Sequence, residues 1–175
     1  MYRGGEGVFQ DDKEAVAWYR KAAEQGDIIA QWLIGYMYAN GRGVVQDYKV
    51  AITWYRKAAN QGIADAQNNL GIMYKMGQGY VQDYNAAVFW FRKAADQGLA
   101  GAHLSMALSY EYGRGVIQDN VYAHMYYNIA ASNDAKDASK WRDELAKKMT
   151  AVDISKAQEL ARECVKKLQG LLISF

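Results

Sequence analysis

Few side chains in this 175-residue chain have the types and spacing that catalysis or metal binding requires. The two histidines, His103 and His124, lie far apart in sequence, and neither has a histidine or carboxylate partner at metal-ligand spacing. The single cysteine, Cys164, has no histidine near it in sequence, which argues against a nucleophile. It also excludes an intramolecular disulfide and a cysteine-clustered metal site. We therefore expect no catalytic residue, no metal and no cofactor.

Recurring Gly-x-Gly pairs are not predicted to be phosphate-binding loops. Segments such as Gly41-Arg42-Gly43 lack the lysine and Ser/Thr of a P-loop and the strand that precedes a dinucleotide site. Each pair is followed by an aspartate, and Asp47, Asp83 and Asp119 are interpreted as helix N-caps, which favour the positive helix end, rather than as a carboxylate cluster.

The charged residues are nearly balanced, with 21 basic and 19 acidic side chains and a net charge of +2. This balance gives no electrostatic reason to expect nucleic acid or an anionic membrane as a partner. Arg-Lys pairs recur near helix ends, where they would offset the negative pole of the helix; the alternative is a basic ladder for an acidic ligand. The pairs are Arg20-Lys21, Arg56-Lys57 and Arg92-Lys93.

No run of about 18 consecutive apolar residues is present, so no membrane span is predicted. Met1 to Gly7 has neither an apolar core nor a cleavage-site pattern, and no signal peptide is expected there. The compartment stays open at this stage.

The strongest pattern in the sequence is a repeat of 36 residues, visible as columns of identical residue types. The columns stay in phase without an insertion, which chance does not produce. They include Trp18, Trp54 and Trp90; Gly26, Gly62 and Gly98; Ala30, Ala66 and Ala102; Tyr38, Tyr74 and Tyr110; and Gln46-Asp47, Gln82-Asp83 and Gln118-Asp119.

Each unit is predicted to contain two antiparallel helices. The first runs from about Ile28 to Asn40, and the second follows Asp47 and runs to about Asn60, with Gly62 ending it. One such pair cannot bury its apolar face alone, so neighbouring pairs must stack into an all-α solenoid. The predicted segments are a half repeat (1–26), three repeats (27–62, 63–98 and 99–134), and C-terminal capping helices with an apolar tail (135–175).

These columns resemble the Sel1-like repeat family, relatives of the tetratricopeptide repeats. The resemblance covers Gly4 to about Ala131 and rests on Ala66 to Tyr74, Gly77-Gln78-Gly79, Gln82-Asp83 and Trp90 to Gly98. It implies a right-handed α-α superhelix with a concave face, and a role as an adaptor in protein complexes. A cysteine-rich bacterial subgroup is associated with β-lactam hydrolysis; this chain lacks that subgroup's paired cysteines, so the activity is not carried over. The bacterial cytoplasm, the periplasm and secretion all remain open.

In this type of repeat the first helix of each pair lines the concave face. In each first helix, a second set of positions points away from the side that packs against neighbouring helices. The residues at these positions differ between units, whereas the residues at the packed positions recur. Trp32 and Tyr36 have no aromatic counterpart in other units, and they either belong to a peptide groove or pack on adjacent helices. The predicted partner-binding residues are Ile29, Trp32, Tyr36, Asn40, Asp65, Asn68, Ile72, Lys75, Leu104, Leu108, Glu111 and Tyr112.

The leading functional hypothesis is a protein-protein interaction scaffold that binds a protein or peptide and is not an enzyme. The alternative is a small-molecule binder of the cell envelope or a β-lactam-hydrolase-like enzyme, for which no catalytic pair is found. A designed consensus repeat without a natural partner is a third alternative, against which the irregular groove columns argue.

The two ends of the chain carry separate expectations. The chain opens inside a repeat, so the apolar side of the helix with Val16, Trp18 and Tyr19 is expected to lack a partner and to pair with another chain. Lys136 to Lys148 is expected to be a charged helix, and Thr150 to cap a final amphipathic helix. The apolar residues 171–175 are expected either to be disordered or packed on this cap, or to dock in a neighbour's groove.

Overall fold

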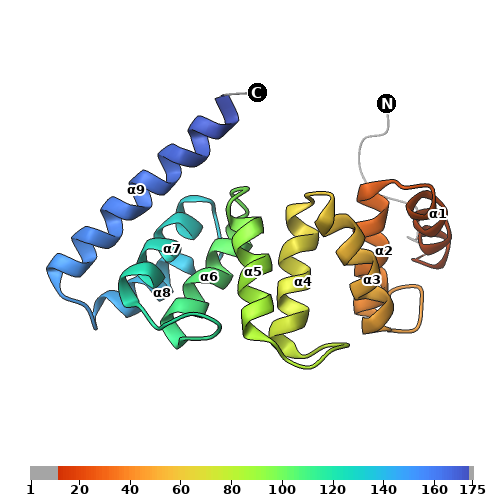
Figure 1. The fold of residues 1–175 in the computed structure, drawn as a ribbon, viewed down its shortest axis with the longest axis horizontal. Helices are drawn as coiled ribbons and strands as arrows, with labels where there is room; N and C mark the ends of the chain where they lie inside the picture. Colours follow the sequence, from red (N-terminus) through yellow and green to blue (C-terminus); the bar gives the residue numbers. More distant parts are fainter. Residues whose placement is uncertain (1–11, 174–175) are drawn as a thin grey trace, which may run out of the picture.

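The computed structural model describes residues 12–173, with side chains described as far as residue 170. Within this range the chain forms nine α-helices and no strands, arranged as an elongated stack (Figure 1). The all-α class predicted from the repeat is therefore confirmed. The helices are α1 (Asp12–Glu24), α2 (Ile28–Asn40), α3 (Tyr48–Asn60), α4 (Ala64–Met76), α5 (Tyr84–Ala95), α6 (Ala100–Tyr112), α7 (Asn120–Ser132), α8 (Ala138–Ala146) and α9 (Ala151–Ile173).

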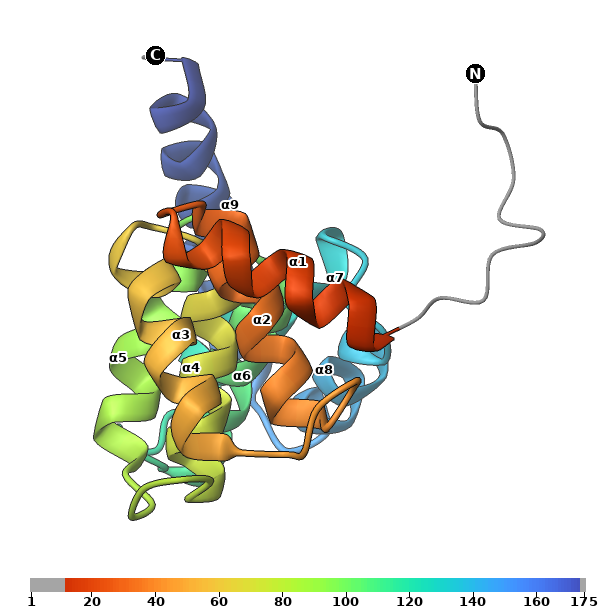
Figure 2. The same ribbon diagram turned by 90° about the vertical axis from the view of Figure 1, so that its right-hand side faces the viewer.

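Helix pairs form the repeating unit of the stack. Helices α2 and α3, α4 and α5, and α6 and α7 pack together, and each second helix also packs on the first helix of the next unit. Successive pairs build an α-α superhelix, seen end-on in Figure 2. Helix α8 takes the place of a further first helix against α7, and α9 also packs on α7 before its C-terminal end leaves the stack (Figure 1).

The helix ends follow the local chemistry of the repeated columns. Asp47 accepts hydrogen bonds from two free backbone amides of α3, Asp119 accepts from two at α7, and Asp83 accepts from one at α5, which confirms all three as N-caps. The first helix of a unit ends at Gly41, whose φ of +65° is left-handed and favours glycine. Before α9, the Thr150 hydroxyl accepts from the backbone amide of Asp153, as the predicted capping pair requires.

Small residues let the two helices of a unit approach each other closely. A Cβ atom added at Gly35 would lie 2.8 Å from Tyr55 Cδ1, and one added at Gly71 would lie 2.5 Å from Phe91 Cε1. Both aromatic rings are almost fully buried. The Gly column of the first helix and the aromatic column of the second helix therefore set the spacing of the pair.

The tryptophan column joins each unit to the one before it. Trp54 packs against the core cluster of α1 and α2, and Trp90 packs against the cluster of α3 and α4. Trp18 occupies the same column in α1 and is 64% exposed. The expectation that the whole apolar side of α1 lacks a partner is wrong, because Val16 is buried and Tyr19 packs with it in the cluster shared with α2.

A series of glutamine hydrogen bonds runs within the units and across their boundaries, with Gln31 and Gln67 buried and Gln61 and Gln97 exposed. Gln31 Nε2 donates to the carbonyl of Ala23 in α1, and Gln31 Oε1 accepts from Gln61 Nε2 at 2.9 Å. One unit later, Gln67 Nε2 donates to the carbonyl of Ala59 and Gln67 Oε1 accepts from Gln97 Nε2. These side chains satisfy buried polar groups that would each cost about 1–3 kcal/mol if left unpaired. We call Gln31, Gln61, Gln67 and Gln97 the glutamine ladder.

The C-terminal helices agree with their predicted pattern. Helix α8 lies within the expected charged segment, and α9 buries Ala157 and Ala161 against Met125 and Ile129 of α7. Residues 171–173 continue α9, but their side chains and residues 174–175 lie outside the described part of the chain, as do residues 1–11. The expectations for the apolar tail and for the half repeat before Asp12 therefore remain predictions.

The close helix approach predicts the effect of adding one methyl group. We expect Gly71→Ala to lower the free energy of unfolding by about 1–3 kcal/mol, since the new Cβ must displace the buried Phe91 ring. Gly101→Ala is the matched control: it is also helical, its nearest foreign atom is Asn68 Nδ2 at 3.7 Å, and it should leave stability unchanged or raise it by up to about 1 kcal/mol. Thermal unfolding followed by circular dichroism compares the two variants, and equal destabilisation by both would contradict the close-contact explanation.

Candidate functional site

The predicted groove residues lie on one side of the first helices, and none of them is fully buried. We call this surface the first-helix face. Five of the predicted residues are exposed and seven are half-buried, so the face is accessible along its length. The exposed residues are Ile29, Tyr36, Asn40, Asp65 and Tyr112, and the half-buried residues are Trp32, Asn68, Ile72, Lys75, Leu104, Leu108 and Glu111.

A first groove pocket of about 260 Å³ opens between α2 and α4. It brings together three predicted residues, Tyr36, Asn40 and Ile72, with Tyr55 of α3 at its base. Burial raises the pKa of Tyr55 well above its ordinary value, so its hydroxyl stays neutral at physiological pH. The lining carries no ionised side chain; it consists of Tyr36, Ala39, Asn40, Gln46, Tyr48, Tyr55, Asn69, Ile72, Met73 and Gln78.

A second groove pocket, of about 50 Å³, occupies the equivalent place one unit later, between α4 and α6. It brings together the predicted residues Lys75, Leu108 and Tyr112. Its remaining walls repeat those of the first pocket, with Tyr84 in place of Tyr48 and Phe91 in place of Tyr55. The lining residues are Lys75, Tyr84, Ala87, Phe91, Ser105, Leu108, Ser109, Tyr112 and Arg114.

Sequence reasoning missed the pocket walls that the second helices and loops supply. Tyr48 and Tyr84 start second helices, and Gln78 and Arg114 belong to the loops, so a search confined to first helices did not include them. A signal was present in the columns, because Tyr48 and Tyr84 are identical and 36 residues apart. The loops are held in place by glutamines: the side chains of Gln46, Gln82 and Gln118 each donate to a carbonyl near the end of the preceding first helix.

The remaining predicted residues do not join these pockets. Trp32 packs against the cluster of α3 and α4, which is the packing role that the sequence left open for it. Trp32 Nε1 and Asn68 Oδ1, at equivalent positions, are buried and have no hydrogen-bond partner among the residues that the structure describes. Glu111 accepts a 2.6 Å hydrogen bond from Tyr127 Oη. The pKa of Tyr127 is raised mainly by burial and, to a smaller extent, by the Glu111 carboxylate. Ile29, Asp65 and Leu104 lie toward the N-terminal halves of the same helices.

Two of the recurring arginines contact first-helix tyrosines. Arg20 Nη2 donates to Tyr38 Oη at 2.5 Å, and Arg56 Nη2 donates to Tyr74 Oη at 2.9 Å. These hydrogen bonds give both arginines a packing role in addition to the helix-end role expected from sequence.

The titratable groups considered from sequence are packed into the stack. His103 is buried, its Nδ1 lies 3.1 Å from the carbonyl oxygen of Leu99, and burial lowers its pKa. His124 is also buried, with its Nδ1 3.3 Å from Asn128 Nδ2, and burial again lowers the pKa. Burial raises the pKa of Cys164, which disfavours the reactive thiolate. Within the described part of the chain, no group of three or more His, Cys, Asp or Glu side chains could hold a metal ion.

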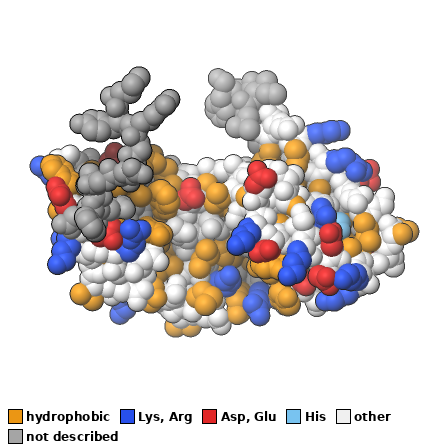
Figure 3. All heavy atoms as spheres, turned by 180° about the vertical axis from the view of Figure 1, so that it is seen from behind, with side chains coloured by type: hydrophobic (Ala, Val, Ile, Leu, Met, Phe, Trp, Pro, Cys, Tyr) orange, Lys and Arg blue, Asp and Glu red, His pale blue; other side chains and the backbone are white. Residues whose placement is uncertain are grey.

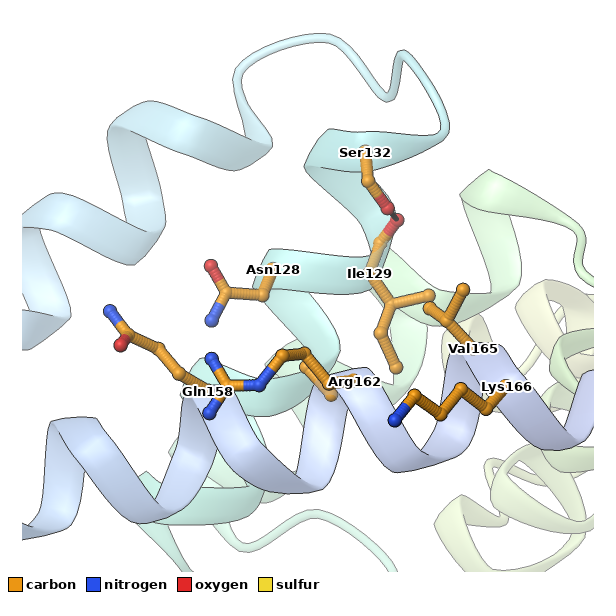
Figure 4. A pocket seen from close by; sticks show the side chains of 8 residues that line it. Asn128, Ile129, Ser132, Gln158, Arg162, Val165 and Lys166 are labelled. Atoms are coloured by element: carbon orange, nitrogen blue, oxygen red, sulfur yellow. Dashed lines mark hydrogen bonds between the residues drawn. The ribbon is translucent and has the colours of Figure 1, made fainter.

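A larger pocket of about 530 Å³ lies apart from the first-helix face, between α7 and α9. Figure 4 shows Asn128 and Ile129 of α7 facing Gln158, Arg162 and Val165 of α9. The 36-residue repeat does not predict this pocket, because α9 lies outside the repeat and its position against α7 is not set by the repeated columns.

The surface as a whole carries mixed chemistry. In the face shown in Figure 3, apolar side chains form patches with Lys, Arg, Asp and Glu side chains between them. None of the helices described within residues 12–173 is both long enough and apolar enough to span a bilayer.

The chain is similar to known Sel1 repeat proteins over most of its length. The Sel1 repeat pattern matches residues 1–27, 28–63, 64–99 and 100–134. A protective antigen of uropathogenic Escherichia coli strains, which displays an SLR fold, is 36% identical over 95% of this chain and superposes with a TM-score of 0.88. This chain spans 36% of the length of that antigen.

Two further solved structures share the architecture. A Sel1 repeat protein from Oxalobacter formigenes is 33% identical, with 92% of this chain and 65% of that chain covered and a TM-score of 0.76. Cysteine rich protein B of Helicobacter pylori is 21% identical, with 78% and 98% covered and a TM-score of 0.59, which indicates a shared fold. No match was found among curated proteins.

His103 predicts a component of acid sensitivity. Because burial lowers its pKa in the folded chain, the unfolded chain binds a proton more readily, so the stability that His103 contributes is present above its ordinary pKa and is lost as the pH falls below about 6.5. His103→Gln replaces it with the residue that stands at positions 31 and 67, and should make stability less dependent on pH between about 6.5 and 5. Urea unfolding at a series of pH values measures this slope, and an unchanged slope in the variant would contradict the assignment.

Proposed function

The chain belongs to the Sel1 repeat family, and on that premise we propose that it binds a protein or peptide partner along a concave surface formed by its first helices. The Sel1 repeat fold is generally a protein-interaction scaffold, and proteins of this family are typically not catalytic. We therefore infer the binding surface of this chain from its own residues.

The observation that carries the proposal is the pair of groove pockets at successive unit junctions. Their walls repeat with the 36-residue period, but the side chains that project from the first helices do not. Tyr36, Ile72 and Leu108 occupy one column, for example, and differ in shape and polarity. A repeating frame with varied contact residues is suited to recognising one extended sequence.

The sizes of these pockets favour side chains over whole small molecules. Small-molecule sites typically enclose about 300–1,000 Å³, and the two groove pockets measure 260 and 50 Å³. Each can therefore receive one side chain or part of one. The exposed rings of Tyr36 and Tyr112 border the pockets, and aromatic residues of this kind provide much of the binding energy at protein interfaces.

Replacing Tyr36 tests the groove directly. Peptides that bind the wild-type chain can be selected from a displayed random library, and we expect Tyr36→Ala to weaken their binding about 10-fold or more by removing an aromatic contact. Phe89→Ala is the matched control, because Phe89 is an exposed ring on α5 that lines neither groove pocket. Fluorescence anisotropy gives the affinities, with thermal unfolding run alongside to verify the fold.

Equal loss of affinity in both variants, or none in either, would place the peptide elsewhere. A loss in Tyr36→Ala that tracks a loss of folded protein would be resolved by Ile72→Ala, which alters the opposite wall of the same pocket.

The exposed ring of Trp18 supports a second, independent contact between two copies of the chain. Its counterparts Trp54 and Trp90 are half-buried against the preceding unit, whereas Trp18 is 64% exposed. We expect multi-angle light scattering at high concentration to give a mass above 19.7 kDa for the wild-type chain and close to 19.7 kDa for Trp18→Ala. A monomeric wild-type chain at high concentration would contradict this contact.

A further inference from the structure

Equivalent positions at the three unit junctions pair different residues, and the differences bear on what the groove binds. The loop after each first helix carries Arg42, Gln78 or Arg114 at the same repeat position. Each of these side chains contacts the residue that begins the second helix of the preceding unit, which is Asp12, Tyr48 or Tyr84, respectively. At the first junction, Arg42 Nη2 lies 3.1 Å from Asp12 Oδ1 and Arg42 Nε lies 3.3 Å from Asp12 Oδ2. This bidentate contact has the geometry that guanidinium and carboxylate groups prefer.

The later junctions lack this carboxylate. At the second, Gln78 Nε2 donates to Tyr48 Oη at 3.3 Å, so an uncharged pair replaces the ion pair. At the third, the Arg114 guanidinium lies over the rings of Tyr84 and Tyr112, at 5.8 and 5.2 Å from their centroids. Among residues 12–170, Arg114 forms no salt bridge.

A second cation faces the same pocket. Lys75 extends from α4 and is half-buried, and its pKa is lowered by burial and then by the nearby charge of Arg114. No salt bridge joins Lys75 to a carboxylate in the part of the chain whose side chains are described. Two positive charges thus converge on one small cavity whose other walls are aromatic, aliphatic and hydroxyl groups. Such an arrangement gains stability when an anion enters.

We propose that the second groove pocket binds an aspartate or glutamate side chain of the partner peptide, between Lys75 and Arg114. The incoming carboxylate takes the role at the third junction that Asp12 has for Arg42 at the first. The cavity of about 50 Å³ exceeds the roughly 10–15 Å³ that a single buried water molecule needs, so it has room for a carboxylate. This inference rests on the proposed peptide-binding function and adds an acidic residue to the expected ligand.

The substitutions that test it are already present at equivalent places in the chain. Lys75→Ala reproduces Ala39, and Arg114→Gln reproduces Gln78, so the double variant is expected to fold. Lys156→Gln, on the exposed side of α9, is the control for the loss of a positive charge.

The first experiment uses a probe that does not depend on a selected peptide. We expect N-acetylglutamate amide to shift the backbone NMR signals of residues 75, 105, 109 and 114 in the wild-type and Lys156→Gln chains. It should leave them unchanged in the double variant, and N-acetylglutamine amide at the same ionic strength should have no effect. Shifts that persist in the double variant, or that the glutamine analogue reproduces, would overturn the proposal. A stronger response to inorganic phosphate would also overturn it, by identifying a phosphate site.

The second experiment uses peptides selected on the wild-type chain. We expect them to share an acidic residue whose replacement by its amide weakens binding to the wild-type chain about 10-fold, but less than about 2-fold in the double variant. Selected peptides without an acidic preference would overturn this inference and leave the proposed function intact. If no peptide is selected but the NMR shifts occur as expected, the pocket assignment stands and the proposed function fails.

Discussion

The contact between a helix glycine and an aromatic ring is the constraint on which the stack depends. At Gly35 and Gly71 the first helix has no side chain, and the rings of Tyr55 and Phe91 fill the space that a Cβ would occupy. This close approach fixes the spacing within each pair, and stacked pairs then place the first helices side by side. The groove pockets follow from the same geometry, since Tyr55 and Phe91 are also their inner walls.

The helices could be predicted from the sequence because the residues that start, end and pack them are close in sequence and recur in every unit. Asp47 as a cap, Gly41 as a stop and the apolar columns between them each depend on neighbouring residues, and together they gave α2 and the end of α3 as observed. The candidate site was predicted only in part. Helical periodicity identifies which side of α2 or α4 is free of packing, but it does not say that Arg114 and Tyr84 come from other elements to face that side. Trp32 shows the same limit, because superhelical curvature brings the next unit against it.

Departures from the repeat proved more informative than the repeat itself. Arg114 opposite Tyr84, in place of Arg42 opposite Asp12, creates a positively charged pocket at one junction. Family membership indicates an interaction scaffold, and such departures are where an individual chain acquires its own ligand. The Sel1 repeat protein from Oxalobacter formigenes and the Escherichia coli antigen share the frame, with about one third of positions identical.

The glutamine ladder has a mechanical consequence. Gln31 and Gln67 tie adjacent units, because each side chain donates to a backbone carbonyl of the preceding second helix. The third boundary is different: His103 Nδ1 contacts the Leu99 carbonyl of its own helix, and Asn133 donates to the carbonyl of Gly98. Contacts in the stack join nearest neighbours, so a pulling force is transmitted through each boundary in series. The boundary at His103 therefore resists a pulling force through a different side chain, Asn133, from those at the boundaries of Gln31 and Gln67.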